Sequence, residues 1–206
     1  MMQKPSAPYP PYLHLGCFDK ILEGWLNCDI TPHIRIARIP GLARLLHGLG
    51  LMTSDRLLQH DTGVFRTVQY LDVTRRFPFS DETFQAAYCS HLLEHLRPEG
   101  AEYCAREVRR VLKAGGVFRV CVPDLDKIIR DYDPLHSEDW CAKILESGQS
   151  RDKNRHHWMY NEHSLAALLQ RAGFTRANRR KYREGDCPGI AEFEMRPDSL
   201  FMEAVK

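Results

Sequence analysis

The chain has 206 residues, 43% of them hydrophobic and 27% charged, so it is long enough for one folded domain and too apolar for a mostly disordered protein. Its net charge of +2 is too small to indicate nucleic acid or a membrane surface as a partner. No apolar run reaches the roughly 18 residues that a membrane span requires, and residues 1–11 lack the apolar core of a signal peptide. The seven cysteines are an odd number without a CxxC pair, which favours a reducing compartment and predicts a cytoplasmic protein.

Strands and helices alternate along the first half of the chain. We expect strands at residues 12–16 and 25–30, a helical insert over about residues 34–60, and further strands at 67–71 and 84–89. Apolar residues of the insert recur at three- and four-residue steps and predict one helix face that packs in the core, namely Ile39, Leu42, Leu45, Leu46 and Leu49. The alternative is that these leucines pack against another protein or against a second copy of the chain. A second copy would make the protein a homodimer.

The second half continues the same alternation. A helix is expected at residues 98–112, because Pro98 suits a first turn and Gly115 and Gly116 would end it. The remaining expected elements are strands at 117–122, 174–182 and 199–205 and a helix at 165–172. The pattern predicts a single α/β domain over residues 1–206, with a doubly wound, mostly parallel seven-stranded sheet and a helical insert after the second strand.

Three features follow strands whose carboxyl ends would share one edge of a parallel sheet, where such sheets bind ligands. They are residues 16–18 after the first strand, Asp29 at the end of the second, and residues 72–73 after the third. Gly16 would let a ligand approach the backbone, Asp29 could accept both hydroxyls of a ribose, and Asp72 could meet the exocyclic amine of an adenine. Together they predict a nucleoside site, although Asp29 alone could simply begin a turn.

Eight stretches carry recognisable motifs: LHLGC (13–17), GWLNCD (24–29), YLDVT (70–74), FPFSDETF (77–84), SHLLEHL (90–96), REVRRVLKAGG (106–116), VPDL (122–125) and HWMY (157–160). In these motifs the chain resembles the class I S-adenosylmethionine-dependent methyltransferases, in particular a type-11-like bacterial group often associated with polysaccharide synthesis. The resemblance implies a Rossmann-like methyltransferase fold and S-adenosylmethionine as the cofactor.

The resemblance also implies roles for individual residues. The cofactor-binding residues would be Leu15, Gly16, Cys17, Phe18, Asp29, Asp72, Val73 and Ser90. Gly16 and Cys17 would face the methionine portion, Asp29 the ribose, and Asp72 with Val73 the adenine. Phe18 departs from the family, which usually has glycine there. Its ring would either crowd the methionine portion or point outward.

Methyl transfer needs little covalent help from a protein, because the sulfonium is already a strong electrophile and alignment supplies much of the acceleration. A base is needed where the acceptor is a hydroxyl. His91 is the first candidate, since imidazole titrates near neutrality, followed by His157 and Tyr160. The alternative for His91 is a hydrogen bond that shapes the pocket. No metal ligand is expected.

Three other functions compete with this interpretation. Residues 91–95 spell H-x-x-E-H, a zinc-peptidase motif, but the motif belongs inside a helix and here follows a strand directly. A nicotinamide-dependent dehydrogenase would need G-x-G-x-x-G after the first strand, and residues 16–21 lack the other glycines. Phe18 favours a third alternative, a methyltransferase-like protein that has lost its donor and serves in binding or assembly.

The acceptor is expected to lie under the helical insert and a cover at about residues 133–160, which is rich in histidine and aromatic side chains that suit sugars or small rings. Basic residues between 151 and 183 would attract an acceptor that bears phosphate, although such charges usually form a solvated face. No recognition motif for nucleic acid accompanies them. The sequence therefore predicts O-methylation of a small-molecule or glycan-type acceptor.

Overall fold

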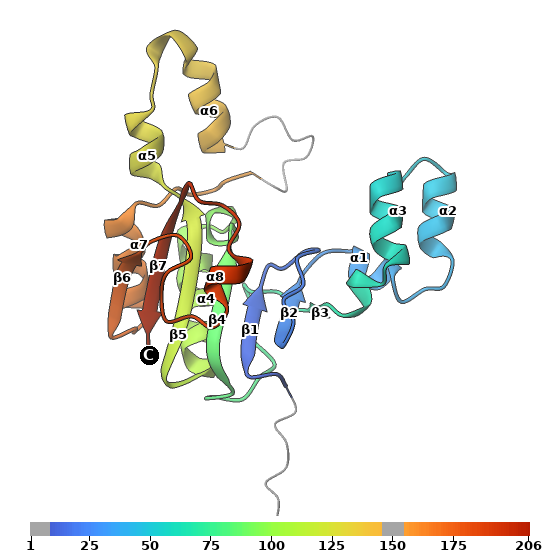
Figure 1. Cartoon of the computed structure of the whole chain (residues 1–206), viewed down its shortest axis with the longest axis horizontal. Helices are drawn as coiled ribbons and strands as arrows, with labels where there is room; N and C mark the ends of the chain where they lie inside the picture. Colours follow the sequence, from blue (N-terminus) through green and yellow to red (C-terminus); the bar gives the residue numbers. More distant parts are fainter. Residues whose placement is uncertain (1–8, 146–154) are drawn as a thin grey trace, which may run out of the picture.

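The computed structural model describes residues 9–145 and 155–206 (Figure 1). The first eight residues and the part of the expected cover at 146–154, with Arg151 and Lys153, lie outside the described residues. No helix within the described ranges combines the length and the apolar character that crossing a bilayer demands.

A seven-stranded sheet forms the centre of the molecule, in the order β3-β2-β1-β4-β5-β7-β6. The strands are β1 (Tyr12–Leu15), β2 (Trp25–Asp29), β3 (Gln69–Tyr70), β4 (Phe84–Ser90), β5 (Leu112–Pro123), β6 (Arg176–Arg180) and β7 (Ser199–Val205). The first five strands pair in parallel, whereas β7 runs antiparallel to both β5 and β6. This confirms the expected α/β class and the mostly parallel seven-stranded sheet.

Two amphipathic helices, α4 (Pro98–Val111) and α7 (Glu162–Arg171), cover one face of the sheet. The buried side chains of α4 are spaced by three and four residues, as in Cys104, Val108 and Val111. In α7, Asn161 and Ser164 form a capping box that satisfies two backbone N–H groups at the start of the helix. The main hydrophobic core therefore lies between these helices and the strands.

The end of α4 differs from the expectation that Gly115 and Gly116 terminate it. The helix ends at Val111, and Leu112 already has extended backbone angles and begins β5. Leu112 pairs with Phe84, and the next paired residue, Val117, faces Ala86, so the intervening residues form an irregularity in the strand. Buried Leu112 continues the core on the sheet, which explains why the chain changes from helix to strand before the glycines.

The opposite face is covered by the short helix α8 (Ile190–Phe193) and the segment before it. Arg119 of β5 is fully buried there and donates hydrogen bonds to the Glu194 carboxylate at 2.9–3.0 Å and to the carbonyls of Lys181 and Glu184, both at 3.0 Å. Its cross-strand neighbour Glu203 lies 3.6 Å away. An ionic network thus fixes this segment on the sheet, and buried charges of this kind must be paired.

The link between β1 and β2 contains no helix, although parallel neighbours are usually joined by one. Asn27 stabilises the link, because its side-chain amide donates to the carbonyls of Leu22 and Trp25, and its Oδ1 accepts from the Leu22 N–H at 2.9 Å. The same Oδ1 lies 3.0 Å from Nδ1 of buried His14. Hydrogen bonds of Asn27, which His14 contacts from the adjacent strand, therefore stabilise this helix-free link.

We expect His14 to make stability depend on pH. Burial lowers the pKa of His14 from 6.5 to about 4, despite the hydrogen bond with Asn27 that raises it. The unfolded chain therefore binds more protons between these values, and the free energy of unfolding should fall as the pH drops from about 6.5 to about 4, by at most about 3 kcal/mol. Urea unfolding at pH 7 and pH 5 measures this fall.

The variant His14→Gln is the matched control, because glutamine can still donate to Asn27 and does not titrate. Burial also lowers the pKa values of His33 and His60, so only the difference between wild type and variant isolates His14. Equal pH dependence in the two proteins would contradict the assignment.

The helical insert lies between β2 and β3 and consists of α1 (His33–Ile36), α2 (Leu42–Gly48), α3 (Ser54–Asp61) and the 3₁₀ turn η1 (Val64–Arg66). Figure 1 shows α2 and α3 as a pair that projects away from the sheet. The expectation that its apolar face packs in the core is wrong for three residues, since Ile39, Leu45 and Leu49 are 55%, 59% and 63% exposed. The physical reason is that α2 and α3 project away from the sheet, so the sheet does not cover their apolar face.

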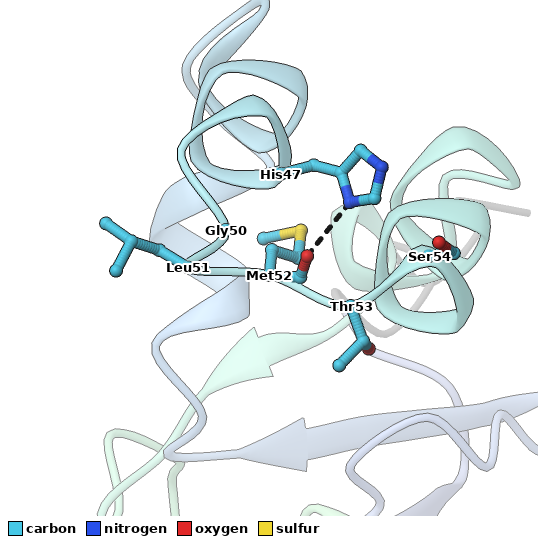
Figure 2. A pocket seen from close by; sticks show the side chains of 6 residues that line it. All are labelled: His47, Gly50, Leu51, Met52, Thr53 and Ser54. Carbon is cyan, nitrogen blue, oxygen red and sulfur yellow. Dashed lines mark hydrogen bonds between the residues drawn. The ribbon is translucent and has the colours of Figure 1, made fainter.

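A cavity of about 480 Å³ lies at the turn between α2 and α3 (Figure 2). All its lining residues belong to one short stretch, 47–54, and the His47 ring is held there by a 2.9 Å hydrogen bond from Nδ1 to the carbonyl of Met52. Figure 2 shows the Leu51 side chain pointing away from this ring. The hollow is local to the turn and is not lined by any of the expected site residues.

Beyond the carboxyl end of β5, the chain forms α5 (Leu125–Arg130), the 3₁₀ turn η3 (Pro134–His136) and α6 (Ser137–Leu145). Figure 1 shows α5 and α6 extending past the sheet. Asp124 caps α5 by accepting hydrogen bonds from the N–H groups of Asp126 and Lys127. A second short turn, η2 (Leu93–His95), follows β4. These segments follow the carboxyl ends of β4 and β5.

Candidate functional site

The sheet brings the three predicted nucleoside-binding positions to one edge. Leu15 pairs with Cys28 and Asp29 with Tyr70, so β1, β2 and β3 end side by side. Gly16 continues directly from Leu15, and Asp72 follows Tyr70 by two residues. This arrangement is the one that the sequence predicts.

Backbone N–H groups orient the Asp29 carboxylate. Its Oδ2 accepts a hydrogen bond from Phe18 N at 2.9 Å, and its Oδ1 accepts one from Thr31 N at 2.6 Å. A carboxylate oxygen can accept more than one hydrogen bond, so both oxygens retain capacity for ligand hydroxyls. Asp29 is half-buried and is therefore presented as a fixed acceptor at the end of β2.

Asp72 is held in a similar way. Its Oδ1 accepts from Thr74 N at 3.0 Å and from Thr74 Oγ1 at 2.6 Å, while Oδ2 lies 3.2 Å from Nε of Arg75. Burial by itself raises the pKa of Asp72, but the contacts with Thr74 and Arg75 outweigh it and keep that pKa below its ordinary value. The carboxylate is therefore ionised at neutral pH. Val73 packs partly buried against the main core.

Gly16 and Cys17 differ in what they can offer a ligand. Gly16 has φ +68°, a left-handed conformation that favours glycine, and a Cβ built on it would lie 3.2 Å from Leu92 Cδ1. Leu92 therefore covers this glycine. The Cys17 side chain is 2% exposed and packs with Ile34 and Val68, and burial raises the pKa of its thiol well above the ordinary value. Cys17 can face a ligand only through its backbone.

The Phe18 ring packs on the helical insert. Its centroid lies 5.9 Å from that of Phe65 and 6.2 Å from that of His33, and the Arg56 guanidinium carbon lies 4.4 Å above the ring. Phe18 itself has φ 46°, which is unusual for a residue other than glycine. These contacts place the Phe18 ring against the helical insert.

His91 follows Ser90 at the end of β4 and also has a left-handed backbone, with φ 52°. Its N–H donates to the Cys121 carbonyl at 2.9 Å, which fixes it at the end of β5. The imidazole lies between two polar groups, with Nε2 2.9 Å from Ser199 Oγ and Nδ1 3.0 Å from Glu94 Oε1. Backbone strain of this kind persists where the surroundings impose it, often at functional sites.

A cavity of about 600 Å³ opens beside this imidazole. Its lining comes from the ends of β4 and β5, from α5 and α6, and from the chain before β7: His91, Pro123, Asp124, Lys127, Ile128, Asp131, Ala142, Lys143, His156, Met195, Arg196, Pro197, Asp198 and Ser199. Apart from the two histidines, the three aspartates of this lining balance its two lysines and one arginine in formal charge. The volume is that of a small-molecule site.

The other two candidate bases are placed differently. Tyr160 belongs to the main core with 2% exposure, and burial raises the pKa of its hydroxyl well above the ordinary value. The His157 side chain is exposed and is not among the residues that line the cavity, whereas its neighbour His156 is. His91 is thus the candidate base that the structure brings to the cavity.

Sequence reasoning missed Ser199, and it included Glu94 only within the H-x-x-E-H motif and His156 only within the expected cover at about residues 133–160. Glu94 is visible in the SHLLEHL motif, which could have indicated it as the partner of His91. Ser199 is 108 positions from His91 along the chain, and no local pattern connects the two.

The expected basic surface is largely neutralised within the described residues. Arg171 pairs with Glu102, Arg179 with Asp124 and Glu162, and Arg180 with Glu203 and Asp186.

The chain is similar to a known protein family. A family model described as a methyltransferase domain matches residues 58–177, a range that begins after Gly16 and Asp29. No curated protein sequence matches the chain.

Several solved structures share the fold. A SAM-dependent methyltransferase from Archaeoglobus fulgidus is 14% identical with a TM-score of 0.55, and the alignment covers 97% of this chain and 87% of that one. One from Methanosarcina mazei is 13% identical with a TM-score of 0.53, covering 95% and 91%. A protein from Thermotoga maritima, described as a possible histamine N-methyltransferase, is 16% identical with a TM-score of 0.52, covering 97% and 83%. At these identities the structures show the fold alone. The family model, however, matches more than half of the chain, which therefore belongs to the family of methyltransferase domains.

Proposed function

We propose that this methyltransferase transfers a methyl group from S-adenosylmethionine to a hydroxyl of a small-molecule or glycan-type acceptor, with His91 as the general base. The observation that carries the proposal is the position of His91, between Glu94 and Ser199 and at the wall of a cavity of about 600 Å³. We further propose that residues 1–206 form one domain of the type-11-like group associated with polysaccharide synthesis.

The residues at the edge of the sheet fit an adenosyl group. Asp29 and Asp72 are carboxylates oriented by backbone N–H donors, and the backbone of Gly16 lies beside them at the end of β1. Asp29 would accept the ribose hydroxyls and Asp72 the adenine amine, with Leu92 closing the site over Gly16. When bound, S-adenosylmethionine supplies a methyl group on a positively charged sulfur.

His91 is suited to remove a proton from a hydroxyl. The negative charge of Glu94, 3.0 Å from Nδ1 but without hydrogen-bond geometry, electrostatically favours a proton on Nδ1 over one on Nε2, which leaves the lone pair of Nε2 to face Ser199 and the cavity. An acceptor hydroxyl that takes the place of the Ser199 contact would be within reach of this lone pair. The geometry therefore supports oxygen as the methylated atom.

The cavity supports a neutral polyhydroxylated acceptor over one that bears phosphate. Lys127 already pairs with Asp198, and Asp124 pairs with Arg179 outside the cavity. Three carboxylates, two lysine ammonium groups and the guanidinium of Arg196 offer both acceptors and donors to sugar hydroxyls, but no excess of positive charge to a phosphate. Ala142 and Lys143 of α6 line the cavity, which supports a covering role for the described part of residues 133–160.

Isothermal titration with S-adenosylmethionine and S-adenosylhomocysteine tests the donor site. We expect wild type to bind both and Asp29→Asn to bind 10- to 100-fold more weakly, because a hydrogen bond to a charged group contributes about 1.5–3 kcal/mol. Asp61→Asn, on the exposed end of α3, is the matched control and should bind as wild type does. Thermal melts establish that the variants are folded.

Absence of heat and of a thermal shift with wild type at millimolar ligand would overturn the proposal and favour a binding or assembly protein. In that case Phe18→Gly distinguishes the cause, since it restores binding only if the aromatic ring blocks the site.

A further inference from the structure

The carboxylate of Glu94 lacks the partners that a buried charge requires. Glu94 lies in η2 with 0% exposure, and among residues 9–145 and 155–206 neither of its side-chain oxygens has a hydrogen-bond partner. Oε1 is 3.0 Å from His91 Nδ1, a contact that is close but does not meet hydrogen-bond geometry. Buried carboxylates are stabilised by paired charges or by metal ions, so this group indicates a missing cation.

Two imidazoles adjoin this carboxylate. One ligand atom from each of Glu94, His95 and His156 can be chosen so that all lie within 4.8 Å of one another, and the two rings are 5.1 Å apart. The Glu94 carbonyl accepts hydrogen bonds from His157 N at 2.7 Å and Trp158 N at 3.1 Å, which fixes the His156 segment against η2. The tertiary fold therefore brings His156 to the consecutive residues Glu94 and His95.

Backbone carbonyls orient both rings in the manner of metal ligands. Nδ1 of His95 lies 3.3 Å from the Arg155 carbonyl, and Nδ1 of His156 lies 3.0 Å from the Ile144 carbonyl. A carbonyl can only accept, so these contacts favour the tautomers with the proton on Nδ1, in which Nε2 is the nitrogen suited to a metal ion. Metal-bound histidines are usually held by such a contact from the other ring nitrogen.

We propose that Glu94, His95 and His156 bind one divalent transition-metal ion at the wall of the acceptor cavity. Two imidazoles and a carboxylate favour zinc and its neighbours in the first transition series over magnesium or calcium, which prefer oxygen ligands. Small side-chain rotations would bring the ligand atoms to the spacing of about 3.4 Å that a tetrahedral ion with bonds of about 2.1 Å imposes.

Three protein ligands leave a coordination position open, as in catalytic zinc sites. His156 lines the cavity, so this position can face an acceptor oxygen and the ion can enter from that side. The role toward the acceptor rests on the proposed function, whereas binding of the ion does not. The site also differs from the H-x-x-E-H peptidase motif, because η2 is a 3₁₀ turn and the second histidine comes from position 156.

The test uses the full chain after dialysis against a chelator, with Zn²⁺ and Co²⁺ as probes. Calorimetry should give one Zn²⁺ per chain with a micromolar or lower dissociation constant, and Co²⁺ should produce visible absorption bands typical of four or five ligands. Zn²⁺ should also raise the melting temperature. His95→Ala and His156→Ala should each weaken binding at least 100-fold and abolish the thermal shift.

Two matched variants make the result specific. His163→Ala removes an exposed imidazole on α7, and Cys141→Ser removes an exposed thiol on α6. Both should bind Zn²⁺ as wild type does. Glu94→Gln should lose Zn²⁺ affinity and, without metal, melt no lower than wild type because it removes an uncompensated charge. If that variant does not fold, the two histidine variants carry the test.

Two outcomes would overturn the proposal. In the first, wild type binds neither Zn²⁺ nor Co²⁺ at millimolar concentration. In the second, His95→Ala and His156→Ala each still bind one Zn²⁺ per chain with the affinity of wild type. Because these measurements need no S-adenosylmethionine, a failure here is distinguishable from failure of the donor site at Asp29.

Discussion

His91→Gln is expected to lower the rate of methyl transfer by about 10²–10⁴-fold, the usual contribution of a positioned general base. Glutamine fills a similar space and keeps a polar group beside Glu94, but its amide cannot accept a proton from an acceptor hydroxyl. The measurement is incorporation of labelled methyl groups into the small-molecule fraction of a cell extract, at saturating labelled S-adenosylmethionine.

Two controls separate chemistry from binding in this experiment. The affinity of His91→Gln for S-adenosylhomocysteine should equal that of wild type, because the expected donor contacts come from Asp29 and Asp72. His163→Gln, on the exposed side of α7, should retain the full rate. If His91→Gln keeps the wild-type rate, His91 is not the general base and instead shapes the pocket.

Arg119→Met is expected to lower the free energy of unfolding by about 3–5 kcal/mol. Methionine fills a similar volume, but the carboxylate of Glu194, which is 1% exposed, would lose three hydrogen bonds from the guanidinium. Glu203 would keep the 3.0 Å contact with Arg180 Nε and would be less affected. Urea unfolding monitored by tryptophan fluorescence measures the loss.

The double variant Arg119→Met, Glu194→Leu should recover most of that stability, because replacing both members of a buried pair by apolar groups is often close to neutral. Arg171→Met is the surface control: its 2.9 Å contact with Glu102 is exposed and screened by solvent, so the change should be below about 1 kcal/mol. A loss in Arg119→Met no larger than that of the surface control would contradict the network described here.

The elements with strong periodicity were predictable, and their limits lie close to those in the structure. The closing strand at 199–205 is one example, and the helix that begins at Pro98 is another. The helix-to-strand change at Leu112 was not predictable from Gly115 and Gly116, because burial of Leu112 in the core decides it. Short helices such as α8 have too few residues for a periodic pattern.

The apolar face of the insert illustrates a different limit. Periodicity correctly indicated a helical region with an apolar face around Leu45, but it carries no information about whether another layer covers that face. Only the path of the chain places α2 and α3 outside the main body, which leaves these side chains exposed.

Residues that lie at strand ends could be predicted from the nearby sequence. Gly16, Asp29, Asp72 and His91 each follow a recognisable strand, and the parallel order of the strands is enough to bring the first three to one edge. Contacts between segments far apart in the sequence could not be predicted in this way. The Ser199 hydroxyl on His91, and the approach of His156 to Glu94, depend on the antiparallel return of β7 and on backbone hydrogen bonds from residues 157 and 158. Local pattern thus determined the class of fold and the edge of the sheet at which Gly16, Asp29 and Asp72 lie. Packing decided which side chains more than sixty positions apart become partners, since no short-range preference encodes which segments meet.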